Sequence, residues 1–142
     1  MRHPRPVVLA CPLAVLAAAL PAGAQDVAPA APPRMAAGIA DKDHGPGAFV
    51  RVACSATCDI TGKVTITYNM RVYLHLPSKT VGTGKGHLDG AGAIDVLVDL
   101  TNRAIGAVRR HHGNQLPVKL TASAKDSEGR TSTLTKKLKI PL

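Results

Sequence analysis

Apolar and polar residues alternate along most of the chain after residue 47. In the stretch AFVRVACSATCDITGKVTITYNM, at 48–70, apolar residues occupy most even-numbered positions of 50–54 and 60–70. Side chains point to alternate faces of a strand, so this pattern predicts two half-buried strands. Because only a short segment separates these two strands, we expect them to pair as a hairpin.

The alternation continues to residue 76 and ends at Pro77. Since this run exceeds a usual strand length, we expect a bend or a crossover near 69–71. Further strands are predicted at 80–88, 93–100, 115–125 and 130–142, the first of them a glycine-rich, weak edge strand. In the last one Lys136 interrupts the apolar face, which indicates an edge or a position from which the side chain snorkels.

The one helical pattern lies at 101–113. Thr101 is suited to cap the helix, and an apolar stripe of Ala104, Ile105 and Val108 follows. Basic residues occupy the last turn, where the helix dipole favours them, and Gly113 is suited to the position after the end. Short strands, glycine-rich turns and a single helix predict an all-β fold. We expect an antiparallel β-sandwich of about seven strands with one short helix between late strands, and a barrel is the alternative.

The N-terminus has the pattern of an export signal. Arg2 and Arg5 precede an apolar run at 7–20, and PAGA at 21–24 provides small residues for cleavage. We expect a signal peptide at 1–24, a disordered Ala/Pro-rich spacer at 25–46 and a domain at 47–142. The protein is then secreted, periplasmic or held in the cell envelope, with no transmembrane segment in the mature chain.

Three cysteines are present, and removal of 1–24 would take Cys11 away. Cys54 and Cys58 would remain as an even pair in an oxidising compartment, which favours a structural disulfide. A redox pair is disfavoured because the spacing is not C-x-x-C and no helix N-terminus lies nearby to lower a thiol pKa. So short a loop would contribute roughly 2 kcal/mol to stability.

Three segments carry a family resemblance: VRVACSATCDITGKVTI, VGTGKGHLDGAGAIDVLVDLTNRAIGAVRR and LPVKLTASAKDSEGRTSTLTKKLKI. Their most specific features are the C-x3-C turn, the Leu-Thr-x-x-Ala helix start and the ending Ala-x-Asp-x-x-Gly. Over 49–140 the chain resembles the immunoglobulin-like modules, often repeated, of secreted surface proteins of high-GC bacteria. This resemblance implies a sandwich similar to fibronectin type III and cadherin-like domains, with a structural or adhesive role and no shared catalytic site. The chain departs from the pattern in having one module and an unusually apolar stretch at 70–79.

No sequence motif points to catalysis. The glycines at 82–86 lack the G-x-x-x-x-G-K-[ST] spacing of a phosphate-binding loop, and no serine lies in a nucleophile-elbow context. We therefore expect a protein that is not an enzyme and that uses no cofactor.

Positive charge is the strongest indication of a partner. Without Arg2 and Arg5, sixteen of the eighteen basic residues remain against nine acidic ones, a formal charge of +7. We expect weak polyanion binding by two clusters, which are Lys136, Lys137 and Lys139, and Arg103, Arg109 and Arg110. The partner would be an anionic cell-envelope polymer or another surface protein. Specific nucleic-acid binding is not expected because aromatic residues are scarce. The simpler explanation of the positive charge is that it keeps the domain soluble and protects edge strands from pairing. The sequence does not indicate an oligomeric state.

Histidines suggest an alternative function, an exported metal-binding protein. The candidate ligands are His75, His87, His111 and His112, since imidazole is a common ligand of zinc and copper. His111 and His112 would point about 100 degrees apart on a helix, so they cannot easily share one ion. Solvated residues at a helix end are the favoured interpretation.

Overall fold

The structure is a computed structural model and describes residues 31–142. It confirms an all-β fold in which two short helices and a 3-10 turn interrupt seven strands. The strands are β1 (Arg34–Ile39), β2 (Gly47–Cys54), β3 (Cys58–Thr65), β4 (Thr80–Leu88), β5 (Gly92–Leu100), β6 (Gln115–Asp126) and β7 (Thr131–Pro141). The helices are α1 (Tyr68–Tyr73) and α2 (Asn102–Arg110), and the 3-10 turn is η1 (Lys42–His44). The signal peptide predicted at 1–24 lies outside the described residues.

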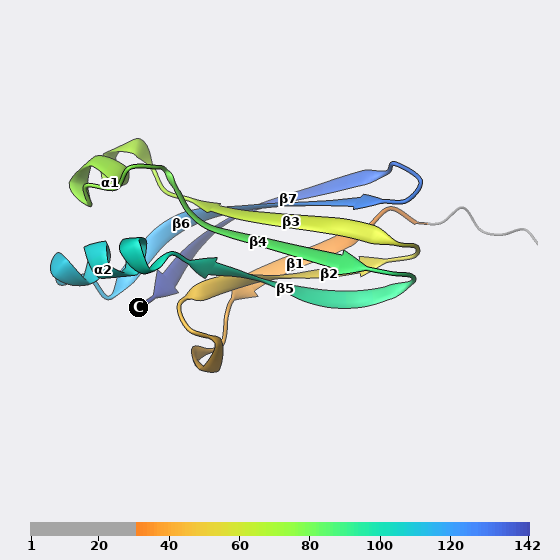
Figure 1. Cartoon of the computed structure of the whole chain (residues 1–142), viewed down its shortest axis with the longest axis horizontal. Coiled ribbons are helices and arrows are strands. Elements are labelled where there is room, and N and C mark those ends of the chain that lie inside the picture. Colours follow the sequence, from red (N-terminus) through yellow and green to blue (C-terminus); the bar gives the residue numbers. More distant parts are fainter. Residues whose placement is uncertain (1–30) are drawn as a thin grey trace, which may run out of the picture.

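All strand pairs are antiparallel, and the strands follow the order β1-β2-β5-β4-β3-β6-β7. β4 and β5 share only the pairs Gly82↔Leu100 and Thr83↔Asp99. Because this junction is so short, the strands fall into two groups, β1-β2-β5 and β4-β3-β6-β7 (Figure 1).

The core lies between the two groups and is built from small aliphatic residues. Burial alternates strictly along β6, where every predicted inward residue is buried: Leu116, Val118, Leu120, Ala122 and Ala124. β2 and β3 contribute their even-numbered residues in the same way, as the period-two pattern predicts. Burial of this continuous apolar face is the main force that holds the groups together.

Glycines allow β4 to lie close to β5. A Cβ at Gly84 would overlap the carbonyl oxygen of Leu97, and one at Gly82 would lie 2.5 Å from the carbonyl oxygen of Asp99. Gly62, the register partner of Gly84 on β3, accommodates Val98 in the same way. The glycine-rich stretch is therefore no flexible edge, because β4 pairs with β3 along its whole length and closes against β5.

β1 and β7, at the two ends of the strand order, approach each other. The Lys136 ammonium group donates a 2.7 Å hydrogen bond to the carbonyl oxygen of Ala37 on β1. The side chain starts from the core side of β7 and reaches the neighbouring edge, which confirms the predicted edge or snorkelling position. The sheet thus nearly closes on itself.

The predicted hairpin between the first two strands is wrong. β2 pairs with β1 and β5, whereas β3 pairs with β4 and β6. The Cys54–Cys58 disulfide, with 6.5 Å between the two Cα atoms, joins strands of different groups. The tight Cys54–Cys58 loop thus carries the chain from one group of strands to the other, and alternation within each strand does not indicate this crossing.

The predicted strand also ends earlier than expected. Its last part forms α1, in which the Thr67 side chain accepts a hydrogen bond from the backbone N–H of Met70. Alternation alone did not reveal this N-cap.

A second difference concerns 25–46, where the pattern predicts a spacer. β1 lies within this range and pairs with β2 from Arg34↔Ala53 to Ile39↔Ala48. An edge strand needs few large apolar residues, and this one has only Met35 and Ile39, the latter 40% exposed.

α2 confirms the predicted helix. The Thr101 side chain caps it by accepting a hydrogen bond from Ala104 N–H, and Ala104, Ala107 and Val108 are buried. The left-handed residue after the helix is His112, with φ 55°, and not Gly113 as expected. Gly113 is needed for space instead, since a Cβ there would lie 2.7 Å from Val108 Cγ1.

Candidate functional site

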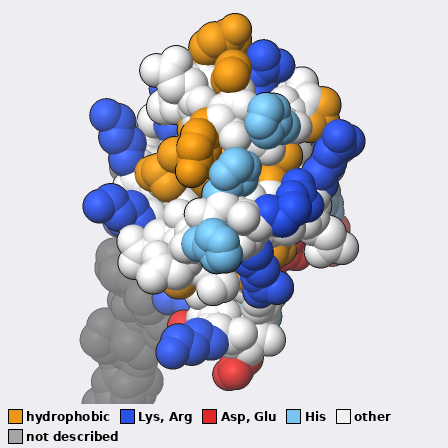
Figure 2. All heavy atoms as spheres, turned by 90° about the vertical axis from the view of Figure 1, so that its left-hand side faces the viewer, with side chains coloured by type: hydrophobic (Ala, Val, Ile, Leu, Met, Phe, Trp, Pro, Cys, Tyr) orange, Lys and Arg blue, Asp and Glu red, His pale blue; other side chains and the backbone are white. Residues whose placement is uncertain are grey.

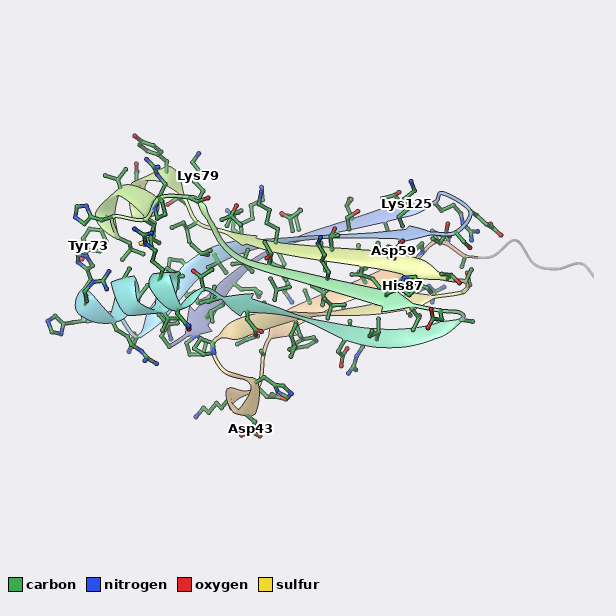
Figure 3. All side chains as sticks on the ribbon, viewed as in Figure 1. Asp43, Asp59, Tyr73, Lys79, His87 and Lys125 are labelled. Carbon is green, nitrogen blue, oxygen red and sulfur yellow. A yellow bond between two sulfur atoms is a disulfide. The ribbon has the colours of Figure 1, made fainter. Side chains whose placement is uncertain are left out.

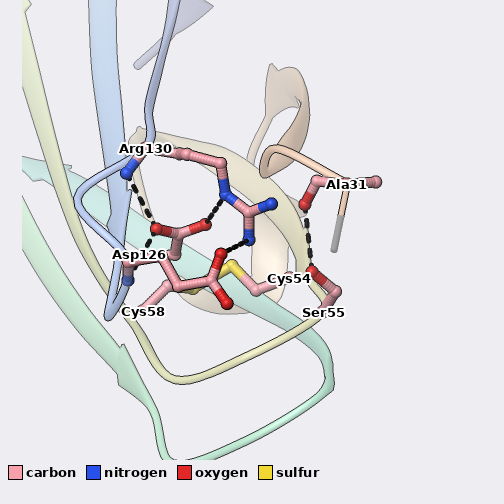
Figure 4. A network of polar contacts seen from close by, with 7 residues as sticks. Ala31, Cys54, Ser55, Cys58, Asp126 and Arg130 are labelled. Carbon is pink, nitrogen blue, oxygen red and sulfur yellow. Dashed lines mark hydrogen bonds and ion pairs between the residues drawn. A yellow bond between two sulfur atoms is a disulfide. The ribbon is translucent and has the colours of Figure 1, made fainter. Parts of the chain in front are cut away.

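The end of the molecule opposite the helices carries the disulfide and a buried carboxylate. Asp126 accepts hydrogen bonds from the Arg130 side chain at 2.7 Å and from the Arg130 and Glu128 backbone N–H groups (Figure 4). Burial alone would raise the pKa of Asp126, but these hydrogen bonds outweigh it and lower the pKa below its usual value. The cluster fixes the β6–β7 turn beside Cys58.

The same end holds His87 between two carboxylates. Its Nδ1 lies 2.6 Å from Asp59 Oδ1 and its Nε2 lies 3.0 Å from Asp89 Oδ1. Figure 3 places His87 and Asp59 side by side on neighbouring strands. The hydrogen bond to Asp59, aided by both negative charges, raises the pKa of His87. The protonated ring is thus favoured, with both nitrogens donating.

These contacts use most of the negative charge. Among residues 31–142 every ion pair involves Arg51, His87 or Arg130. The carboxylate partners all lie in the strands and turns of this half, and they are Asp59, Asp89, Asp95, Asp126 and Glu128. Hydrogen bonds from Arg51 lower the pKa of Asp95. The remaining lysines and arginines of the described residues are therefore uncompensated by ion pairs.

The opposite end carries both helices, and we name it the helical pole. It comprises α1, α2 and the segments 74–79 and 111–114 that follow them (Figure 1). Viewed from this end, histidine side chains lie along the middle of the surface, apolar side chains lie above them, and lysines and arginines surround both (Figure 2). The basic residues of the pole are Arg71, Lys79, Arg103, Arg109 and Arg110.

Exposed aromatic residues gather at the helical pole. Both tyrosines of the chain, Tyr68 and Tyr73, lie on α1, and each is 58% exposed. The Arg71 guanidinium lies 5.1 Å and the Lys79 ammonium 5.6 Å from the Tyr68 ring centroid, so both make cation–π contacts. α1 buries no residue, and Val72 is also 48% exposed. The helix thus presents its aromatic surface to solvent.

Histidines join the two helices at their ends. The Tyr73 and His111 rings lie 4.6 Å apart, and the His75 ring stacks on His111 at 6.5 Å. His75 and His112 have left-handed backbone, with φ 52° and 55°. After each helix the next N–H bonds back to the last turn, Leu76 to Arg71 and Gly113 to Val108. This is the Schellman arrangement, in which glycine usually occupies the left-handed position.

A second feature adjoins the pole on the outer face of β3, β6 and β7. A groove of about 530 Å³, which we name the lysine groove, has a mostly apolar lining. Its lining residues are Thr65, Ile66, Thr67, Pro117, Val118, Lys119, Lys137, Leu138 and Lys139. Thr67 also caps α1, so the groove is continuous with the helical pole.

The structure divides the predicted basic clusters. Arg109 and Arg110 lie at the tip of α2 and Arg103 near its start, all at the helical pole. Lys137 and Lys139 line the lysine groove, whereas Lys136 lies on the other face of β7 and bonds to β1. The prediction missed Lys119 and the exposed tyrosines. Lys119 comes from a distant strand, and only the register Lys119↔Lys137 brings it into the cluster.

The predicted histidine ligands are partly separated. His87 lies at the disulfide end, in β4, while His75, His111 and His112 lie at the helical pole. Within residues 31–142 no group of three or more His, Cys, Asp or Glu is placed to hold a metal ion. The metal alternative therefore rests on the proximity of His75 and His111 alone.

The fold and the site define an antiparallel all-β protein with one cationic, aromatic end. No family model, curated protein or solved structure matches the chain. None of the helices within residues 31–142 has the length and hydrophobicity that crossing a bilayer requires.

Proposed function

We propose that the chain is an exported, non-catalytic immunoglobulin-like module that binds an anionic polymer of the cell envelope through its helical pole. The observation that carries this proposal is the distribution of charge. Carboxylates at the disulfide end are held in ion pairs, whereas the arginines and lysines of the pole have no carboxylate partner among residues 31–142. Unpaired charge of one sign attracts a ligand of the other sign.

The strand order supports the immunoglobulin-like part of the proposal. The order β1-β2-β5-β4-β3-β6-β7 contains the A-B-E-D and C-F-G orders of that sandwich, and α2 takes the place of the E–F connection. The difference is that β4, at the D position, pairs mainly with β3 and only briefly with β5. Export is supported by the N-terminal pattern and by the disulfide, which is typical of oxidising compartments.

The composition of the pole supports binding over simple solubility. Lysines that only keep a domain soluble need no aromatic neighbours, whereas here both tyrosines are exposed among the cations. Exposed aromatic and arginine residues are also the types most enriched at binding hot spots. The pole thus combines long-range attraction with apolar surface for close contact.

Co-sedimentation of the purified chain with isolated cell envelope tests this function. We expect retention at low salt and release as salt rises, because screening shortens the range of surface charges from about 30 Å at 0.01 M to about 10 Å at 0.1 M. A parallel set with a metal chelator should give the same curve. Retention that does not change with salt contradicts the proposal and favours a protein partner. Retention that is lost only with the chelator also contradicts it and favours metal binding by the histidines.

A further inference from the structure

The lysine groove exists because β3 leaves the sheet there. Thr65 is the last residue of β3 that pairs with β6, opposite Lys119, and the chain then turns into α1. Pro117, two residues before Lys119, has no backbone N–H that would need a partner in the opening. The hydroxyl of Thr65 donates to the Lys119 carbonyl oxygen at 3.2 Å and closes the inner end of the gap.

Charge inside the lysine groove is all of one sign. Lys119 and Lys137 are direct cross-strand partners, and Lys139 follows on the same face of β7. Like charges placed directly opposite each other destabilise a sheet. No carboxylate lines the groove, and within residues 31–142 none of the three ammonium groups has an ion-pair partner. A bound anion would offset the repulsion between these ammonium groups.

We propose that the lysine groove binds one acidic sugar unit of the envelope polymer, so that the ligand is an acidic polysaccharide. This inference rests on the proposed function and adds the chemical class of the ligand and its binding site. The three ammonium groups would hold the carboxylate or phosphate group of the sugar. The Thr67 hydroxyl, whose oxygen accepts from Met70 N–H, keeps its own hydrogen for a sugar oxygen.

The shape and lining of the groove favour a glycan over a lipid surface. The lysines lie in a concave site of about 530 Å³, which a single sugar chain can enter and a flat bilayer cannot. Its mostly apolar lining matches the carbon-bearing face of a sugar ring. Tyr68 follows Thr67 in the chain and is 58% exposed, and the Arg71 and Lys79 cations that contact its ring would attract the next acidic unit of the polymer.

The test compares two triple variants of the purified chain by calorimetric titration with short oligogalacturonate. K119Q/K137Q/K139Q removes the groove charges. K63Q/K85Q/K125Q removes the same charge from exposed lysines on the outer faces of β3, β4 and β6. We expect the groove variant to bind at least about tenfold more weakly than the control, since each lost contact near a protein surface changes a dissociation constant several-fold.

Additional probes separate this inference from the proposed function. Neutral maltooligosaccharide should not bind, and vesicles rich in anionic lipid, polyphosphate and single-stranded DNA should bind more weakly than oligogalacturonate. If both triple variants bind oligogalacturonate equally and R109E/R110E loses binding, the lysine groove is not the binding site, and the proposed polyanion binding still stands. If the chain binds vesicles, polyphosphate or DNA most tightly, the inference that its ligand is an acidic polysaccharide is wrong. If the wild-type chain binds none of these anions, the proposed function fails as well.

Discussion

Gly84 lies where β4 meets β5, next to the two register pairs that join the two groups of strands on this side. Its register partner is Gly62, and Val98 packs over both. A methyl group at Gly84 would overlap the backbone of Leu97, and backbone cannot rotate away as a side chain can. Small residues at this position are therefore a condition for the closed core.

Substitution G84A tests this contact. We expect it to lower the free energy of unfolding by about 3 kcal/mol, the upper range for overpacking, because the overlap is with backbone. The control is G90A in the β4–β5 turn, where a Cβ would meet nothing within 4 Å, and its effect should stay within about 0.5 kcal/mol. Equal urea denaturation midpoints for the two variants would show that β4 and β5 do not lie this close.

His87 should make stability depend on pH. Because its pKa is raised above the usual 6.5, mainly by the hydrogen bond to Asp59, its charged contacts stabilise the fold fully below about pH 6.5. This contribution is lost as pH rises through the raised folded-state pKa. We expect H87N to be less stable than wild type in mildly acidic solution, and the difference to vanish in alkaline solution. Urea denaturation over a pH series measures this, and a difference that is constant with pH would contradict it.

At the scale of elements, periodicity predicted the central strands and α2 because their inner faces are continuous and apolar. It failed in two places where a local feature decides the structure. The Thr67 cap and the Schellman end at His75 convert an alternating stretch into α1. The sequence pattern did not predict β1, because its centre consists of alanines and a glycine and resembles a spacer in composition. Pairing partners, and with them the lysine groove, depend on contacts between distant strands that alternation does not encode.

Both helix ends should be more stable with glycine. His75 and His112 have left-handed backbone, which disfavours residues with a Cβ, so H75G and H112G should each raise the free energy of unfolding by about 0.5 kcal/mol. The matched control is H111G, whose residue has φ −91°, and it should destabilise by about 0.5 kcal/mol or more. Thermal unfolding of the three variants gives the comparison. Destabilisation by all three would mean that the histidine contacts outweigh the backbone cost.

At the scale of the whole molecule, the ion pairs of residues 31–142 lie in the half that carries the disulfide. The sequence predicted an excess of positive charge and two of its clusters, but not that the ion pairs would gather at the disulfide end and include no basic residue of the helical pole. Alternation wrongly placed Tyr68 on an inward face, whereas it placed Tyr73 on the outer face, and both rings are exposed. Folding thus gathers the ion pairs of residues 31–142 at one end and leaves the basic residues of the helical pole without a carboxylate partner.

The most direct measurement compares envelope binding by two charge-reversal variants of equal net charge across a salt series. R109E/R110E changes the tip of α2 at the helical pole, and K63E/K85E changes the outer faces of β3 and β4. We predict that the pole variant loses at least about tenfold in affinity at low salt, since each reversed charge acts at close range, and that the control stays near wild type. Equal losses in the two variants would mean that only net charge matters, which would contradict a binding surface at the helical pole.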